Sequence, residues 1–168
     1  MSLIIQKFKY NQSLRLLSIY NSARVRGFFY KKNRISFDEH ISFLVNKLEK
    51  KNCIIYLAFI NNNSPAIGYV RFDKLKKSGI YEISIATIPK YYGKGYGSIM
   101  IKTAISKLKI YKFKKIIAVV KKNNQRSFRF FIKNNFKLFA GKSIYINTIN
   151  PLNLKKEYCM YYNNFDKS

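Results

Sequence analysis

The sequence predicts one mixed α/β domain built around a central β-sheet, and three observations support this. Short apolar runs with strand character alternate along the chain with segments of helical periodicity. The 168 residues, 48% of them apolar, suffice for one hydrophobic core. The sequence contains no internal repeat, low-complexity linker or break rich in proline and glycine. We therefore expect a single domain over residues 1–168.

The first part of the chain predicts a strand followed by two helices. Apolar residues alternate well enough over Leu3–Tyr10 for a strand. We expect Ser13 to cap the first helix, whose apolar positions continue to Tyr20. Ser36 and Glu39 have the spacing of a capping box, and apolar residues follow at helical spacing. A second helix is therefore expected directly after Ser36.

Three strands are expected next. Cys53–Ile60 is an apolar run that ends at a turn rich in asparagine. Ala66–Asp73 and Ile80–Ile88 flank a short polar link, which is typical of an antiparallel hairpin. Cys53 and Cys159 lie in apolar runs, far apart and without a CxxC pattern, so we expect buried free thiols.

Helix and strand alternate in the rest of the chain. A glycine-rich loop precedes a helix over Gly97–Leu108, and Lys115–Val120 is a short apolar strand. Asn124 opens a helix over Gln125–Lys133, and Glu157–Tyr162 predicts the last strand. The residues of the first of these helices that we expect to face inward are Ile99, Met100, Ala104, Ile105 and Leu108.

The chain is strongly basic, with 33 Lys and Arg against 7 Asp and Glu and a net charge of +26. Such a charge attracts polyanions such as nucleic acid and nucleotides. The basic residues are scattered, however, and Asn, Ile, Tyr and Phe are abundant too, so a general drift in composition is the preferred explanation of the charge.

Several classes of protein are disfavoured. The sequence has no run of 18 apolar residues and no signal-peptide pattern, so we expect a cytoplasmic protein without a membrane span. With one histidine and no cysteine pair, no metal site is expected. That histidine, His40, is expected to be a buried structural residue rather than a base.

The segment that ends at Ser98 carries the main functional motif. An apolar strand runs into Pro89, which stops ladder pairing, and Gly93, Gly95 and Gly97 follow before an amphipathic helix. Glycine permits a positive φ and a close approach of the backbone to a ligand. Unpaired N–H groups of the first helical turn then point at that ligand, so the pattern predicts an anion site. The glycine spacing fits neither a Walker A loop nor a Rossmann fingerprint.

Two motifs resemble those of the GNAT acyltransferases. Pro89–Gly97 is similar to motif A of the family, Gln/Arg-x-x-Gly-x-Gly/Ala, with Tyr92 at the position of Gln or Arg. Asn124–Phe136 is similar to motif B, with Phe131 at the position of the usual tyrosine. The resemblance spans roughly Asn21 to Phe136. It implies the GNAT fold, with about six to seven strands in a mixed sheet that splays at its centre, and about four helices on its two faces.

The resemblance also implies that the chain is an N-acetyltransferase that uses acetyl-CoA as co-substrate. Backbone groups of Ile85–Thr87 would pair with the pantetheine arm, and the N–H groups of Gly93–Ser98 would hold the pyrophosphate. The side chain of Asn124 would bond to the pantetheine. The full set of expected coenzyme-binding residues is Ile85, Ala86, Thr87, Tyr92, Gly93, Lys94, Gly95, Tyr96, Gly97, Ser98, Asn124 and Phe131.

Glu82 is the candidate catalytic residue. An acceptor of ordinary lysine type, with a pKa near 10.4, must lose a proton before it attacks the thioester. A carboxylate can take that proton, often through water, and Glu82 lies on the strand that leads into the glycine loop. The alternative is that Glu82 is an ordinary exposed or salt-bridged strand residue. The N–H of the residue after Ile85 could polarise the thioester carbonyl.

The group that protonates the leaving thiolate is open. Phe131 has no proton to give, so Tyr92, Tyr91 or water could serve, or the thiolate could leave unassisted. A descendant that binds the coenzyme without catalysis is a further alternative.

Three N-terminal segments, Tyr20–Arg26, Ile35–Phe43 and Ile67–Asp73, resemble GNAT enzymes of nonulosonic acid pathways, such as the pathway to pseudaminic acid. Those enzymes acetylate nucleotide-linked amino sugars. The implied acceptor is the 4-amino group of a UDP-linked amino-dideoxy sugar. The residues expected to contact its phosphates or sugar are Arg24, Arg26 and Arg71, each of which could equally be a surface residue.

Two other functions stay open. The first is a protein acetyltransferase of the ribosomal N-terminal or lysine type, whose motif A also has an aromatic residue at the position of Tyr92. The positive charge of the chain fits basic ribosomal tails poorly and favours an anionic nucleotide sugar. The second is a non-catalytic nucleic-acid-binding module, which would need exposed aromatics among clustered basic residues. The acyl chain and the oligomeric state, a homodimer included, do not follow from the sequence.

Overall fold

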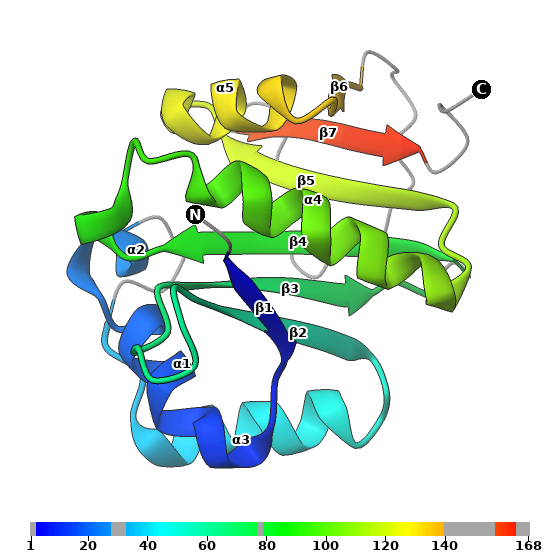
Figure 1. Ribbon diagram of the computed structural model, residues 1–168. Helices are drawn as coiled ribbons and strands as arrows, with labels where there is room; N and C mark the ends of the chain where they lie inside the picture. Colours follow the sequence, from blue (N-terminus) through cyan, green and yellow to red (C-terminus); the bar gives the residue numbers. More distant parts are fainter. Residues whose placement is uncertain (1–2, 28–32, 77–78, 140–156, 164–168) are drawn as a thin grey trace. The chain divides into compact units, whose positions relative to one another are not determined.

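A computed structural model describes residues 3–27, 33–76, 79–139 and 157–163 of the chain. Its strands form a sheet in the order β1-β2-β3-β4-β5-β7-β6 (Figure 1). β4 and β5 are parallel, whereas β1 with β2, β5 with β7 and β6 with β7 are antiparallel, so the sheet is mixed. The predicted mixed α/β fold is confirmed. The strands are β1 Ile4–Lys7, β2 Cys53–Phe59, β3 Gly68–Lys74, β4 Ile80–Thr87, β5 Lys115–Lys121, β6 Lys137–Leu138 and β7 Glu157–Asn163.

The helices of the described residues lie where the sequence predicts them, with one short helix in addition. They are α1 Ser13–Tyr20, α2 Ala23–Arg26, α3 Phe37–Leu48, α4 Tyr96–Leu108 and α5 Gln125–Lys133. Short 3-10 turns precede α1 and α4 and follow α4. None of these helices has the length and apolar character that crossing a membrane requires.

Contacts divide the chain into two compact units. The first unit comprises Met1–Arg71 and Ile85–Ala104, and the second comprises Phe72–Ser84 and Ile105–Ser168. The expectation of a single domain stays a prediction.

The core of the first unit forms around β2, which is buried at every position. β2 pairs with β1 in a register that places Ile4 opposite Phe59, and α1 lies beside α3 (Figure 1). A continuous apolar run suits a strand that is covered on both faces, which is why this strand shows no alternation. The buried residues of this core are Phe8, Leu16, Ile19, Tyr20, Leu44, Cys53, Ile55, Leu57, Phe59, Ala66 and Tyr69.

The predicted capping box of α3 is confirmed. The Glu39 N–H donates to Ser36 Oγ at 3.2 Å, and the Ser36 N–H donates to Glu39 Oε2 at 2.8 Å. The predicted cap at Ser13 is wrong, because Ser13 is already helical, with φ −57° and ψ −43°. The 3-10 turn ahead of α1 runs straight into it, so Ser13 cannot adopt the extended conformation of a capping residue.

The second unit is built on the pairing of β5 with β7, which runs from Lys115 opposite Asn163 to Lys121 opposite Glu157. β4 joins this ladder in parallel through its first three residues. Aromatic rings pack on one another against β7, and the ring centroids of Phe136 and Tyr162 are 5.5 Å apart. The last predicted strand is therefore confirmed and serves as the sheet partner of β5.

The inward face of α4 differs from the prediction at one residue. Met100, Ala104 and Leu108 are fully buried, as expected, but Ile99 is 39% exposed. Ile101, which the prediction omitted, is fully buried instead. Ile101 lies two positions after Ile99, about 200° around the helix, and falls among the other buried positions, whereas Ile99 lies outside them.

Both cysteines are free and buried, as predicted. Burial, together with the nearby charge of Glu82, raises the pKa of the Cys159 thiol to about 11. Cys159 is therefore a thiol and not a reactive thiolate at neutral pH.

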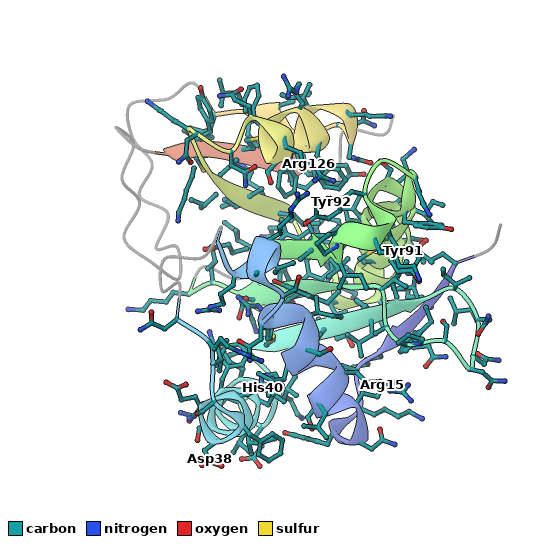
Figure 2. The ribbon with its side chains drawn as sticks, turned by 90° about the vertical axis from the view of Figure 1, so that its left-hand side faces the viewer. Arg15, Asp38, His40, Tyr91, Tyr92 and Arg126 are labelled. Atoms are coloured by element: carbon teal, nitrogen blue, oxygen red, sulfur yellow. The ribbon has the colours of Figure 1, made fainter. Side chains whose placement is uncertain are left out.

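His40 is buried between α1 and α3, as Figure 2 shows, which confirms a structural position. Its Nε2 lies 3.1 Å from the Ser13 carbonyl oxygen, and its buried Nδ1 has no hydrogen-bond partner among the described residues. Burial lowers the pKa of His40 below its ordinary value of 6.5, and the bond to Ser13 opposes this in part. The unfolded chain therefore takes up a proton at a higher pH than the folded protein does.

This linkage predicts a loss of stability in acid that depends on one side chain. Below about pH 6.5 the unfolded state binds the extra proton, so the free energy of unfolding should fall as the pH falls. His40→Gln should be less stable at pH 7.5 but should lose less stability between pH 7.5 and pH 5. Urea unfolding of both proteins at the two pH values measures the difference. Equal losses in the two proteins would contradict the assignment.

Candidate active site

The loop between β4 and α4 begins with a 3-10 turn over Pro89–Tyr91. The Tyr91 N–H donates to the Ile88 carbonyl at 3.0 Å, and the Tyr92 N–H donates to the Pro89 carbonyl at 3.0 Å. Gly93 and Gly95 then adopt φ values of +77° and +78°. These are left-handed conformations that glycine adopts without strain, as the sequence motif predicts.

Backbone donors gather where this loop enters α4. The N–H groups of Ser98 and Ile99 both donate to the Gly95 carbonyl, at 3.0 and 3.3 Å. The N–H groups of Gly93, Lys94, Gly95 and Gly97 have no acceptor among the described residues. The four free donors lie at or just before the N-terminal end of a 13-residue helix, where the helix dipole favours an anion. The anion site stays a prediction.

The space around these donors is open. A Cβ atom placed on Gly93 or Gly95 would meet no other atom within 4 Å. Figure 2 labels Tyr91 and Tyr92 on this loop. The ammonium groups of Lys90 and Lys94 lie 5.9 and 5.6 Å from the centre of the Tyr91 ring, which adds positive charge beside the donors. An oxyanion with several oxygen atoms, such as the pyrophosphate of coenzyme A, fits these features.

The end of β4 packs closely against Gly68 of β3 and Met100 of α4. A Cβ atom on Gly68 would lie 2.5 Å from the Ala86 carbonyl oxygen and 2.7 Å from Met100 Cε. The Thr87 hydroxyl donates to Met100 Sδ at 3.7 Å, and the Ile88 N–H donates to the Ile67 carbonyl at 2.8 Å. The half-buried segment expected to pair with pantetheine therefore rests on a glycine and a methionine.

In the second unit, Asn124 is the N-cap of α5, as predicted. Its Oδ1 accepts the Ser127 N–H at 3.1 Å, and its Nδ2 makes no hydrogen bond with a described residue. The remaining donor, Nδ2, is suited to the carbonyl oxygen of a pantetheine amide.

Phe131 and Glu82 also lie in the second unit. Phe131 is only 5% exposed, and its ring packs edge-on against Phe130 and Phe136. Glu82 is half-buried on β4, in register with Ile117 of β5. Its charge raises the pKa of Cys159, so the carboxylate lies near that thiol, on the sheet face that carries Ile117 and Cys159.

The three N-terminal segments that the sequence singled out are bonded to one another in the first unit. The Asn21 side chain clamps the Ile35 backbone, with Nδ2 donating to its carbonyl and Oδ1 accepting its N–H, both at 2.8 Å. Arg71 donates to the Tyr20 hydroxyl at 3.2 Å and lies 5.1 Å from the centre of the Phe43 ring. Arg71 therefore ties β3 to α1 and α3.

The other two arginines differ from each other. Arg24 is exposed, and its side chain makes no hydrogen bond, ion pair or ring contact with a described residue. Arg26 is only 7% exposed, and its Nε donates to the Asn33 carbonyl at 2.7 Å. Beside it lies a cavity of about 450 Å³, lined by Asn21, Ala23, Arg26, Gly27 and Arg34. The sequence reasoning missed Arg34, because the clamp between Asn21 and Ile35 brings it to α2 without any local pattern.

The comparisons with known proteins agree with this arrangement. A model of the acetyltransferase (GNAT) family matches residues 16–136, which is most of the chain. No curated protein matches the sequence.

Solved structures share the fold over nearly the whole chain. A spermidine N-acetyltransferase from Vibrio cholerae, in complex with CoA and spermine, is 16% identical with a TM-score of 0.77, covering 96% of this chain and 95% of that one. A putative acetyltransferase, yncA, from Salmonella typhimurium with its cofactor acetyl-CoA is 15% identical with a TM-score of 0.74, covering 97% and 94%. A ribosomal-protein-alanine N-acetyltransferase from Brucella melitensis is 14% identical with a TM-score of 0.73, covering 95% and 99%.

The family match covers both the glycine loop with its free amide donors and the strand and helices that position it. The chain therefore belongs to the GNAT family and is an N-acetyltransferase that uses acetyl-CoA.

Proposed function

We propose that the acceptor is the 4-amino group of a UDP-linked amino-dideoxy sugar. The observation that carries the proposal is that the three segments similar to amino-sugar acetyltransferases form one bonded network. Asn21 clamps Ile35, Arg71 reaches Tyr20 and Phe43, and α1 contacts α3 through His40. The three segments that resemble amino-sugar acetyltransferases are therefore in contact with one another in the folded protein.

Charge supports the same choice. The chain carries +26, so an anionic nucleotide sugar is attracted over long distances. A polyamine or a basic ribosomal tail is repelled by the same field, and that repulsion is strongest at low salt.

The chemistry proposed for this site assigns three tasks to the protein. The free amides of the loop from Gly93 to Gly97 hold the pyrophosphate, and Ile85–Thr87 with Asn124 hold the pantetheine. Acetyl-CoA supplies the thioester, whose carbonyl oxygen would accept a hydrogen bond from the Ala86 N–H. Glu82 takes the proton that the acceptor ammonium must lose, directly or through water.

The proton for the leaving thiolate has no donor at Phe131, which is buried and carries no hydroxyl. Tyr91 and Tyr92, both half-buried on the coenzyme loop, are the side-chain candidates, and water is the other. The pH–rate profiles of Tyr91→Phe and Tyr92→Phe distinguish these proton donors.

An acceptor panel tests the proposed function. The protein is incubated with acetyl-CoA and, separately, a UDP-4-amino-4,6-dideoxy sugar, spermidine and a peptide with an N-terminal alanine. Thiol release is followed, and the buried Cys53 and Cys159 keep the background of protein thiols low. We expect turnover of the nucleotide sugar. Turnover of the peptide or of spermidine alone would overturn the sugar assignment.

Replacing the proposed base should slow the chemical step. Glu82→Gln is nearly the same size but cannot accept a proton, so kcat should fall on the order of 10²-fold, and the acidic limb of the pH–rate profile should disappear. Glu39→Gln is the matched control, because glutamine keeps the capping box of α3. An unchanged rate and pH profile in Glu82→Gln would remove Glu82 as the base.

A further inference from the structure

We propose that the cavity between Arg26 and Arg34 is an oxyanion subsite that binds the diphosphate of the acceptor. The inference rests on the proposed function for the identity of the acceptor. It adds the site at which the diphosphate of that acceptor binds. It also adds Arg34, a residue that no sequence motif indicates.

The cavity is framed by bonds that fix its walls. The clamp between Asn21 and Ile35 joins the segment ahead of α2 to the segment ahead of α3, with two hydrogen bonds of 2.8 Å. The bond from Arg26 Nε to the Asn33 carbonyl, at 2.7 Å, joins α2 itself to the segment ahead of α3. Arg34 lies between these anchor points, so its backbone position is set from both sides.

The charge of the cavity is of one sign. Its described lining contains two guanidinium groups, from Arg26 and Arg34, and no carboxylate. Arg26 is 7% exposed, so its charge is poorly screened by water. Arg34 is exposed and makes no hydrogen bond or ion pair with a described residue, so its guanidinium is available to a ligand.

The ligand class follows from these groups. Guanidinium presents a planar set of donors that matches phosphate oxygens in pairs. Asn21, Ala23 and Gly27 complete the described lining, and none of them carries a charge. A cavity of about 450 Å³ with such a lining can admit a diphosphate and exclude a polyamine, whose ammonium groups would meet two like charges.

Binding of uridine, UMP and UDP tests the subsite. The protein is first saturated with CoA, so that the amides of the glycine loop are occupied and cannot bind the added phosphates. Titration calorimetry should then show binding that strengthens from uridine to UMP to UDP. In Arg34→Gln the Kd for UDP should rise by about tenfold, with partial recovery in Arg34→Lys, which keeps the charge without the paired donors.

Arg15→Gln is the matched control. Arg15 is an exposed arginine on α1 (Figure 2), it lies 6.0 Å from the centre of the Phe59 ring, and its loss changes the net charge by the same amount. An equal rise of the Kd for UDP in Arg15→Gln and Arg34→Gln would mean general attraction to a basic chain and would overturn the subsite. An unchanged Kd in Arg34→Gln would overturn it as well.

The proposed function and the subsite can fail separately. If the nucleotide sugar is not acetylated but UDP binding still depends on Arg34, the subsite stands and the acceptor assignment fails. If the sugar is acetylated with the same KM in wild type and Arg34→Gln, the acceptor assignment stands and the subsite fails.

Discussion

Replacing Gly95 by alanine is expected to raise the Kd for acetyl-CoA by about tenfold. Gly95 has a φ of +78°, and an L-residue in this left-handed region costs roughly 1–2 kcal/mol. The loop of the variant relaxes toward negative φ, and the N–H groups around Gly95 then no longer converge on the pyrophosphate. A Cβ at this position meets no protein atom within 4 Å, so the effect comes from the backbone conformation rather than from a clash.

Gly79→Ala is the control that separates the effect of backbone strain on stability from its effect on coenzyme binding. Gly79 has a similar φ of +76° but lies in the second unit, at the start of β4. This variant should lose stability while binding acetyl-CoA with unchanged affinity. Titration calorimetry gives the Kd, and thermal unfolding gives the stability of each variant. If both variants bound the coenzyme as wild type does, the glycine loop would not be the pyrophosphate site.

Replacing Gly68 by alanine should be the most destabilising of these small changes. The added Cβ would lie 2.5 Å from the Ala86 carbonyl oxygen, which belongs to the backbone and cannot move without β4. Overpacking of this kind costs about 1–3 kcal/mol, which corresponds to a fall in Tm of roughly 3–10 °C for a chain of this size. The KM for acetyl-CoA should rise as well, because Ala86 is displaced.

Gly27→Ala is the steric control for stability. Its Cβ would come no closer than 3.5 Å to the Ala23 carbonyl oxygen, and its φ is −58°, so it adds a methyl group without a clash or strain. Thermal unfolding should show a Tm close to that of wild type. An equal fall in Tm in Gly27→Ala and Gly68→Ala would contradict the tight packing of Gly68 under β4.

The elements that were predicted most accurately are those whose signals are local. The capping box of Ser36 with Glu39 and the cap at Asn124 depend on residues within one helical turn. The glycines before α4 likewise permit positive φ locally, and Gly93 and Gly95 adopt it. For such features the sequence contains both partners of the interaction within a few residues.

The predictions that were wrong depend on how distant segments meet. Ser13 has the chemistry of a cap but lies inside a helix, because the preceding turn continues into α1. Ile99 fits an apolar stripe as well as Ile101 does, and the packing of α4 decides which of them is buried.

The order of the elements, the family and the positive φ values of the glycine loop could be predicted from the sequence, since backbone conformation and capping are short-range effects. The pairing of β5 with β7, the close approach of Gly68 to Ala86 and the cavity that Arg26 and Arg34 line could not be predicted from it. They join residues that are far apart in the chain or have no shared periodicity. These contacts form because they bury apolar surface and satisfy hydrogen bonds in the folded protein. A local sequence pattern does not show which distant residues will pair.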